Sequence, residues 1–144
     1  MSAKKDEKPK RKIKIAFNGL SPRDWTITSR SVWTARDVSS MRQSHHIEHG
    51  ATFPTALAEK AIKMYTAKND LVFDPFLGVG STLLAAKKLE RNGLGIELYK
   101  NFSTISKNLL KQETLGNTVT HKVVNGDCRN LNKHLKSNSV QLTF

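Results

Sequence analysis

The feature that most constrains the fold is an alternation of apolar runs and helix-period segments between residues 51 and 144. Three apolar runs and the start of a fourth have the length and composition of strands: LVFDPF (71–76), GLGIEL (93–98), VTHKVVNGD (119–127) and 140–144. Apolar residues at helical spacing predict helices over 54–65, 81–89, 102–111 and, as a short turn, 131–135. Strands that alternate with helices pair in parallel through right-handed crossovers. The pattern therefore predicts an α/β fold with an incomplete parallel sheet of about four strands.

The 144 residues have the length of a single domain, and their composition changes along the chain. We expect a disordered basic tail over residues 1–12, an N-terminal extension over residues 13–50, and a partial cofactor-binding domain over residues 51–144. Residues 8–14, which begin in the tail, have the sequence KPKRKIK, the composition of a nuclear address or a nucleic-acid-binding arm. A solvated tail is the simpler interpretation and is preferred.

The extension is poorly periodic. Ile13, Ile15 and Phe17 alternate as they would in a short strand. Trp25 and Trp33 lie close together in the sequence, and they either anchor this segment on the core or line a binding groove. Packing on the core is the preferred interpretation.

Histidine and cysteine residues give little support for a metal or redox site. His45, His46 and His49 cluster in the extension, but no cysteine or paired carboxylate completes a ligand set there, so no metal site is expected. Cys128 is the only cysteine. An internal disulfide is therefore excluded, which fits a reducing, intracellular and cytoplasmic location.

The charge balance points to a polyanionic partner. The chain has 24 Lys and Arg residues against 12 Asp and Glu residues, a net charge of +12. Nucleic acid is the first expectation and an anionic membrane surface the second. No apolar run approaches the roughly 18–20 residues that span a bilayer, and the chain begins with charge rather than an apolar leader. We therefore expect DNA or RNA, and no membrane insertion.

The loop after the first predicted strand has the composition of a ligand-binding turn. It runs from Asp74 to Thr82 with the sequence DPFLGVGST. Gly78 and Gly80 allow positive φ and a close approach of the backbone to a ligand. The helix that follows offers free N–H groups, so the loop suits an adenosine-containing cofactor at the carboxyl edge of a parallel sheet. A purely structural glycine turn would have the same sequence.

Acidic residues follow the next two predicted strands. Glu97 ends the second strand and is placed to accept hydrogen bonds from ribose hydroxyls, whereas Asp127 ends the third and is placed to accept from an adenine amino group. Either acid alone could equally cap the helix after it. Three successive strand ends with such residues favour a nucleoside site. Leu83 stands where a dinucleotide fingerprint needs glycine, and no P-loop motif is present, which leaves S-adenosylmethionine as the preferred cofactor.

Four segments of the chain closely resemble the DNA amino-methyltransferases that modify cytosine N4 or adenine N6. The segments are HGATFPTALAEKAI (49–62), DPFLGVGST (74–82), GIEL (95–98) and NGDCRNL (125–131). The resemblance covers residues 49–144, and more loosely SVW (31–33). It implies a Rossmann-like S-adenosylmethionine-dependent methyltransferase fold, a DNA substrate and, commonly, a role in restriction-modification.

The resemblance also implies roles for individual residues. The methionine end of the cofactor maps to Thr52, Phe53 and Pro54, the ribose acid to Glu97, and the adenine acid to Asp127. The glycine loop supplies the remaining cofactor-binding positions: Asp74, Phe76, Gly78, Gly80, Ser81 and Thr82. Two positions depart from the family pattern, because Gly50 replaces a usual proline and Val79 a usual small residue. Val79 is expected to crowd the loop without preventing binding.

The catalytic motif of that family is missing from the 144 residues. The family holds the target amine with a [D/N/S]-P-P-[Y/F/W] loop after the fourth strand, which is also where an aromatic ring stacks on a flipped base. The chain has prolines only at positions 9, 22, 54 and 75. Cys128, which follows Asp127, is a poor nucleophile for the alternative cytosine C5 chemistry. No catalytic residue is therefore assigned.

These observations leave three functional interpretations. The preferred one is the S-adenosylmethionine-binding half of a site-specific DNA methyltransferase, either split or truncated, that needs a complementary methyltransferase polypeptide for catalysis and target recognition. The second is a non-catalytic nucleic-acid-binding or regulatory module that retains the fold. The third, an RNA or small-molecule methyltransferase, is disfavoured by the HGATFP segment and the basic composition.

Overall fold

A computed structural model describes residues 16–34, 36 and 52–144 of the chain. The predicted tail, the three clustered histidines, Ile13 and Ile15 lie outside the described residues. Within them the helices are α1 (Pro22–Thr28), α4 (Thr55–Tyr65), α5 (Ser81–Lys88), α6 (Lys100–Gln112) and the 3₁₀ helix η1 (Cys128–Lys133). The strands are β1 (Leu71–Asp74), β2 (Asn92–Glu97), β3 (His121–Asn125) and β4 (Leu142–Thr143).

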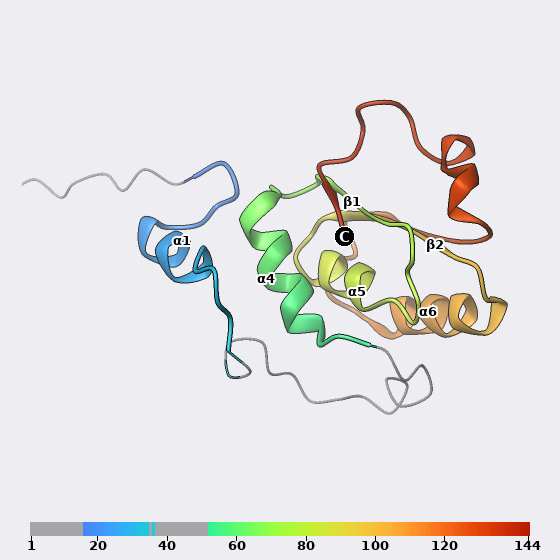
Figure 1. Cartoon of the computed structure of the whole chain (residues 1–144), viewed down its shortest axis with the longest axis horizontal. Coiled ribbons are helices and arrows are strands. Elements are labelled where there is room, and N and C mark those ends of the chain that lie inside the picture. The colour runs from blue at the N-terminus through green and yellow to red at the C-terminus, as the bar shows by residue number, and fades with distance from the viewer. Residues whose placement is uncertain (1–15, 35, 37–51) are drawn as a thin grey trace, which may run out of the picture.

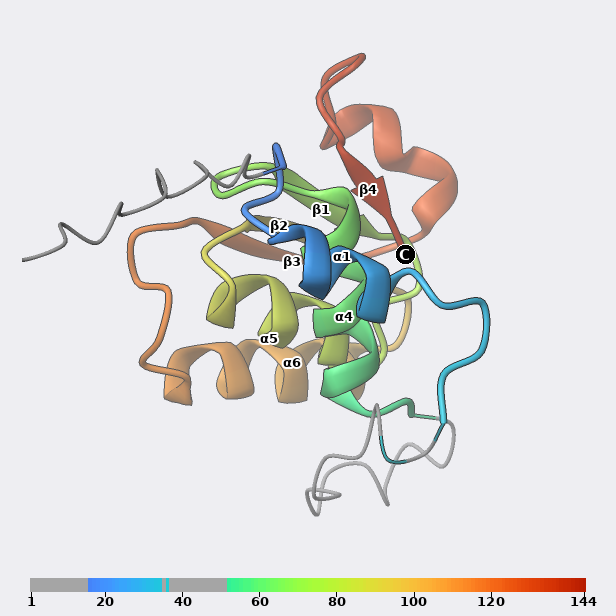
Figure 2. The same ribbon diagram turned by 90° about the vertical axis from the view of Figure 1, so that its left-hand side faces the viewer.

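The four strands form one parallel sheet in the order β3-β2-β1-β4. Figure 1 labels β1 and β2 within the fold, and Figure 2 labels all four strands. In its register Val72 pairs with Gly93, Gly95 with Val123, and Phe73 with Thr143. This arrangement confirms the predicted parallel α/β sheet. The chain steps outward from β1 to β2 and β3 and then returns to the other side of β1. Strand order thus reverses between β1 and β4, and ligands of such sheets bind outside the carboxyl ends of the strands near that reversal.

Helices and the long β3–β4 connection cover opposite faces of the sheet. Helices α5 and α6 lie on one side of the strands, and η1 lies on the other (Figure 2). The side chains of β1 alternate accordingly, because Val72 packs with α4 and α5 whereas Phe73 packs with Leu135 and Val140 of the β3–β4 connection. β1 is therefore buried on both faces, as expected for a strand inside a parallel sheet.

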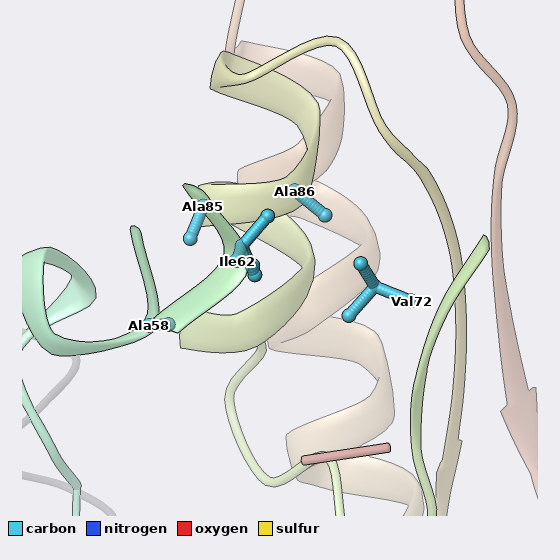
Figure 3. Packing of buried hydrophobic residues seen from close by; sticks show 5 residues of the cluster. All are labelled: Ala58, Ile62, Val72, Ala85 and Ala86. Atoms are coloured by element: carbon cyan, nitrogen blue, oxygen red, sulfur yellow. The ribbon is translucent and has the colours of Figure 1, made fainter. Parts of the chain in front are cut away.

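Small side chains bring α4, α5 and β1 together in one part of the core. Ala58 and Ile62 of α4 face Ala85 and Ala86 of α5, with Val72 of β1 beside them (Figure 3). All five are fully buried. Two adjacent alanines on α5 let the helix backbones approach closely, so that one isoleucine and one valine fill the space between three elements.

The N-terminal extension differs from its sequence-based prediction. Phe17 lies in a turn and not in a strand, because Gly19 reverses the chain with a φ of +79°. Helix α1, which the sequence pattern did not predict, begins at Pro22 after Ser21, whose hydroxyl accepts from the Asp24 N–H. This is a standard N-cap with proline at the first helical position.

The two tryptophans are packed to different degrees. The Trp33 ring lies 4.6 Å from Lys60 Nζ of α4, and its indole N–H donates to the Thr28 carbonyl. Trp25 is 38% exposed on α1. Trp33 therefore anchors the extension on α4 as expected, whereas Trp25 contributes much less to that packing. Among the described residues no helix has the length and apolar character to cross a membrane, and no group of three His, Cys, Asp or Glu side chains is arranged to hold a metal ion.

Candidate functional site

The loop between β1 and α5 begins the candidate site. Asp74 Oδ1 accepts a hydrogen bond from the Phe76 N–H over 2.9 Å, which turns the chain sharply after the strand. Gly78 and Gly80 have φ values of +56° and +99°, so both predicted turn glycines occupy conformations that favour glycine. Among the described residues no side chain caps the amino end of α5, and Ser81 and Thr82 of its first turn are buried.

Glu97 connects the end of β2 to this loop. Its Oε2 accepts from the Gly78 N–H over 2.8 Å, and its Oε1 accepts from the Tyr99 N–H over 2.8 Å. The side chain is only 7% exposed. Each carboxylate oxygen retains a second acceptor lone pair. Glu97 therefore both fixes the glycine loop and keeps capacity for hydroxyl donors.

Asp74 is the buried acid beneath the loop. Burial raises the pKa of its carboxyl group, and the nearby negative charge of Glu97 raises the pKa further. The hydrogen bond from Phe76 opposes this change. Asp74 does not line the pocket described below, so its contribution is to shape the loop from underneath.

Asp127, expected at the end of the third strand, lies two residues beyond the end of β3 at Asn125 and is the N-cap residue of η1. Its side chain accepts from the Arg129 N–H over 2.9 Å, and the Arg129 guanidinium contacts both carboxylate oxygens. The hydrogen bonds from Arg129 are the main reason that the pKa of Asp127 falls to about 2. Asp127 is thus ionised at neutral pH, and it combines the helix-capping role that the sequence left open with a surface ion pair.

These strand ends meet at one pocket of about 450 Å³, here called the strand-end pocket. Glu97 and Asp127 both line it, together with Pro75, Phe76, Leu98, Tyr99, Phe102, Gly126, Cys128 and Arg129. Phe76 is 78% exposed and Tyr99 is 63% exposed, so apolar and aromatic surface flanks two carboxylates. Such a combination of a mostly apolar wall and few polar groups is typical of a small-molecule site.

Three of the eleven predicted cofactor residues line this pocket. Phe76, Glu97 and Asp127 line the pocket, and Gly78 is hydrogen-bonded to Glu97. Gly80, Ser81 and Thr82 are buried in the loop and the first turn of α5. Val79 is 2% exposed and does not line the pocket.

The first predicted motif, Thr52 to Pro54, lies elsewhere. Pro54 is the N-cap residue of α4. The Phe53 ring stacks on Phe144 with centroids 5.4 Å apart, beside Val72 and Leu142. None of the three lines the strand-end pocket, so this motif sits near β4 and β1 and not with Glu97 and Asp127.

Several pocket residues had no predicted cofactor role. Leu98 and Tyr99 follow Glu97 directly, and Phe102 lies in the first turn of α6 with its ring edge-on to Tyr99 at 6.0 Å. Arg129 stands two positions after Asp127, and that spacing was the one available sequence signal for their ion pair. The apolar residues carried no such signal, because an exposed aromatic after a strand is indistinguishable in sequence from one that packs in the core.

The sequence matches the model of a known protein family. The family model N6_N4_Mtase, described as DNA methylase, matches residues 1–108. The matched range begins in the predicted tail and ends within α6. It therefore includes the glycine loop and Glu97 but stops before Asp127.

Individual Type II methyltransferases are also similar to the chain in sequence. The Type II methyltransferase M.MthZI of Methanothermobacter thermautotrophicus is 36% identical over 107 residues, which is 73% of this chain and 28% of that protein. The Type II methyltransferase M.ScaI of Streptomyces caespitosus is 32% identical over 111 residues, or 75% of this chain and 34% of that protein. The chain thus spans about a third of the length of these relatives.

Solved structures are also similar to the chain, and one of them illustrates the likeness in both fold and sequence. It is TTHA0409, a putative DNA modification methylase from Thermus thermophilus, complexed with S-adenosyl-L-methionine. The TM-score is 0.58 at 29% identity, over 76% of this chain and 40% of that one.

Proposed function

Because the chain belongs to the DNA methylase family whose model matches residues 1–108, we propose that it is the S-adenosylmethionine-binding part of a DNA methyltransferase that modifies an exocyclic amine, cytosine N4 or adenine N6. The Rossmann-like fold predicted from the sequence is confirmed by the parallel sheet and by the similar Thermus thermophilus structure. The observation that carries the proposal is the meeting of Glu97 and Asp127 in one pocket, with Glu97 hydrogen-bonded to Gly78 of the glycine loop.

The chemistry of the strand-end pocket fits a nucleoside with a positively charged sulfur. Its two acids are acceptors for hydroxyl and amino groups, and Phe76, Leu98 and Tyr99 offer apolar surface to a flat ring. The pocket volume of about 450 Å³ lies within the range of roughly 300–1,000 Å³ common for small-molecule sites. Among its lining residues Arg129 is the only Lys or Arg, and it is already paired with Asp127.

We assign separate roles to the residues of this pocket. Glu97 binds the ribose hydroxyls while it holds the Gly78 amide. Asp127 accepts from the adenine amino group, in competition with Arg129. The glycine loop brings backbone close to the ligand, and Phe76 and Tyr99 exclude water from the ring faces. Thr52, Phe53 and Pro54 remain a proposed contribution to the methionine end of the site.

The reaction itself requires groups that these 144 residues do not contain. S-Adenosylmethionine supplies a methyl group that leaves its sulfonium when an amine nitrogen takes it up. The residues that orient the amine and accept its proton are proposed to lie on a complementary polypeptide, since no Pro-Pro pair occurs in the printed sequence. DNA is the proposed substrate, and the net charge of +12 supports association with its backbone.

Calorimetric titration with S-adenosylmethionine tests the binding proposal. We expect saturable binding by the chain, alone or co-expressed with a complementary methyltransferase fragment. Glu97→Gln should weaken the binding by about tenfold or more, since an amide nitrogen would face one of the two N–H donors now bound to the carboxylate. Glu59→Gln on α4 makes the same charge change outside the pocket and should leave the affinity unaltered. The absence of binding in both preparations would refute the proposal.

A second candidate is a non-catalytic nucleic-acid-binding module. The basic composition and the missing Pro-Pro motif favour it. Tritiated methyl transfer to duplex DNA by the reconstituted pair would exclude this candidate. Steeply salt-dependent DNA binding without methyl transfer in any pairing would support it.

A further inference from the structure

A second pocket lies at the opposite end of β3 from the strand-end pocket. It has a volume of about 380 Å³ and is here called the basic pocket, defined by Lys87, Lys107, Lys111, Asn117, Val119 and His121. Its residues come from α5, α6, β3 and the segment between α6 and β3. The two pockets share no lining residue, so the basic pocket is independent of the proposed cofactor site.

The lining of the basic pocket contains three cations and no acid. The closest candidate for a neutralising group on α6 and its following turn is Glu113. Its carboxylate is already engaged, because Oε2 lies 3.7 Å from Lys88 Nζ and Oε1 accepts from the Leu115 N–H over 3.0 Å. The positive charge of the pocket is therefore not balanced by a carboxylate in its wall.

Lys87 is held in place at the back of this pocket. Its Nζ donates to the Leu110 carbonyl over 2.8 Å and to the Glu113 carbonyl over 2.7 Å. An ammonium group has three donors, so one donor and the full charge remain. These two hydrogen bonds already fix the long Lys87 side chain. Ligand binding would therefore not lose the conformational entropy of this side chain.

Lys107 and Lys111 complete the cation set from α6. They are exposed and one helical turn apart, and like charges at this spacing repel one another modestly. An anion between them would replace that repulsion with attraction. A helix that presents two exposed lysines beside a third, fixed lysine is thus suited to bind a compact anion with several acceptor oxygens.

His121 of β3 lines the basic pocket beside Lys87. The pKa of His121 is lowered to about 4, mainly by burial and in part by the positive charge of Lys87. A hydrogen bond with the Arg91 backbone acts in the opposite direction and raises the pKa. The imidazole is therefore neutral at pH 7 and adds no competing charge. Its Nε2 is buried without a hydrogen-bond partner among the described residues.

We propose that the basic pocket binds a phosphate group through Lys107 and Lys111, with Lys87 behind them. The group belongs either to a small phosphate or nucleotide or to a nucleic-acid backbone. Phosphate is preferred over a carboxylate because it offers more acceptor oxygens to the converging ammonium groups. Nothing in this site depends on the cofactor pocket. A free phosphate as the source goes beyond the proposed function, whereas the DNA backbone as the source rests on it.

Amide NMR titrations of the full chain test the proposal. Inorganic phosphate, adenosine 5′-monophosphate and a short DNA duplex are added separately at low salt. We expect saturable shifts at Asn117, Val119 and His121. Saturation by phosphate or the mononucleotide identifies a free phosphate as the source, whereas saturation by the duplex alone identifies the DNA backbone.

Matched charge variants distinguish binding at the basic pocket from a general effect of the net charge of the chain. Lys107→Gln/Lys111→Gln should weaken the effective ligand by about tenfold, equivalent to about 1.4 kcal/mol. Lys63→Gln/Lys122→Gln removes the same charge from exposed lysines outside the pocket lining and should have little effect. Circular dichroism confirms that both variants fold. The proposal is overturned if no ligand gives saturable shifts in the pocket, or if both double variants weaken binding equally.

Discussion

Ser106 of α6 packs directly against Gly80, so that the glycine loop has no room for a β-carbon at this position. Ser106 is fully buried, and Gly80 has a φ of +99°. The residue before α5 is therefore constrained twice, by its backbone conformation and by the helix beneath it. This relationship ties the position of α6 to the shape of the loop that borders the strand-end pocket.

Gly80→Ala is predicted to destabilise the chain and impair cofactor binding. A left-handed conformation costs a non-glycine residue about 1–2 kcal/mol, and the clash with Ser106 adds to this cost. The melting temperature should fall by about 5 °C or more for a domain of this size. Differential scanning calorimetry and cofactor titration would measure the two effects.

Gly19→Ala is the matched control for backbone strain. Gly19 has a φ of +79°, but within the described part of the chain no atom beyond its immediate neighbours lies within 4 Å of an added β-carbon. Gly19→Ala should therefore lower the free energy of unfolding only by the cost of a left-handed backbone conformation at a non-glycine residue. Gly80→Ala/Ser106→Gly should recover the steric part of the loss. Equal losses for Gly19→Ala and Gly80→Ala would show that contact with Ser106 is unimportant.

The sequence predicted the sheet because each strand of the central part has a local signature. Gly78 and Gly80 marked the turn after β1, and Glu97 marked the end of β2. Their alignment at one edge follows from parallel pairing alone. The parts of the site that depend on such regular geometry were therefore accessible without coordinates.

Other features depend on tertiary packing and were not accessible. The stacking of Phe53 on Phe144 joins residues that are far apart in the sequence, and no local pattern encodes that contact. Helix α1 is short and lacks a clear apolar period, so only its Ser-Pro start was visible in principle. The basic pocket likewise arises from α5, α6 and β3 together.

Removal of Arg129 is predicted to raise the pKa of Asp127 from about 2 towards its ordinary value of 3.8. In the native chain the low pKa contributes stability above pH 3.8, and this contribution is lost as the pH falls from 3.8 to about 2. Arg129→Gln keeps the backbone N–H at position 129, so the pKa should remain slightly depressed. The carboxyl carbon shift of Asp127 in an NMR pH titration measures the change.

Lys133→Gln provides the control for this titration. It removes another cation of η1 that makes no contact with Asp127. The pKa of Asp127 should stay near 2 in that variant. A similar increase in both variants would mean that net charge, and not the specific ion pair, holds the pKa low.

The low pKa of His121 predicts a loss of stability in mild acid. The imidazole titrates near pH 4 in the folded chain and near 6.5 when unfolded. Between these values the unfolded chain binds more protons, so stability declines as the pH falls from 6.5 to 4. His121→Phe removes this contribution. The difference in urea-unfolding free energy between pH 7 and pH 5 should be smaller in the variant than in the native chain.

The buried carboxyl of Asp74 does not affect this comparison. Its raised pKa acts in the opposite direction, since the folded chain then holds its proton more readily than the unfolded one. Asp74 is present in both proteins, and its effect cancels in the difference. Identical pH dependence of the native chain and His121→Phe would contradict the prediction.

Arg91 is predicted to be the single most important polar side chain for joining α4 to the sheet. It is 5% exposed and immediately precedes β2. Its Nε donates to Thr66 Oγ1 over 3.0 Å and its Nη2 to the Thr66 carbonyl over 2.8 Å, while Nη1 donates to the Leu89 carbonyl. Arg91→Met keeps much of the volume but removes the donors to two buried acceptors of Thr66 and to the partly buried Leu89 carbonyl. Each unsatisfied acceptor costs about 1 kcal/mol or more, so urea unfolding at pH 7 should show a loss of about 3 kcal/mol.

Two further variants are controls for this loss. Arg91→Lys supplies fewer correctly oriented donors and should recover only part of the loss. Arg23→Met, on the exposed surface of α1, should change stability by no more than about 0.5 kcal/mol. If Arg91→Met were as stable as Arg23→Met, the hydrogen bonds to Thr66 and Leu89 would not be what fastens α4 to β2.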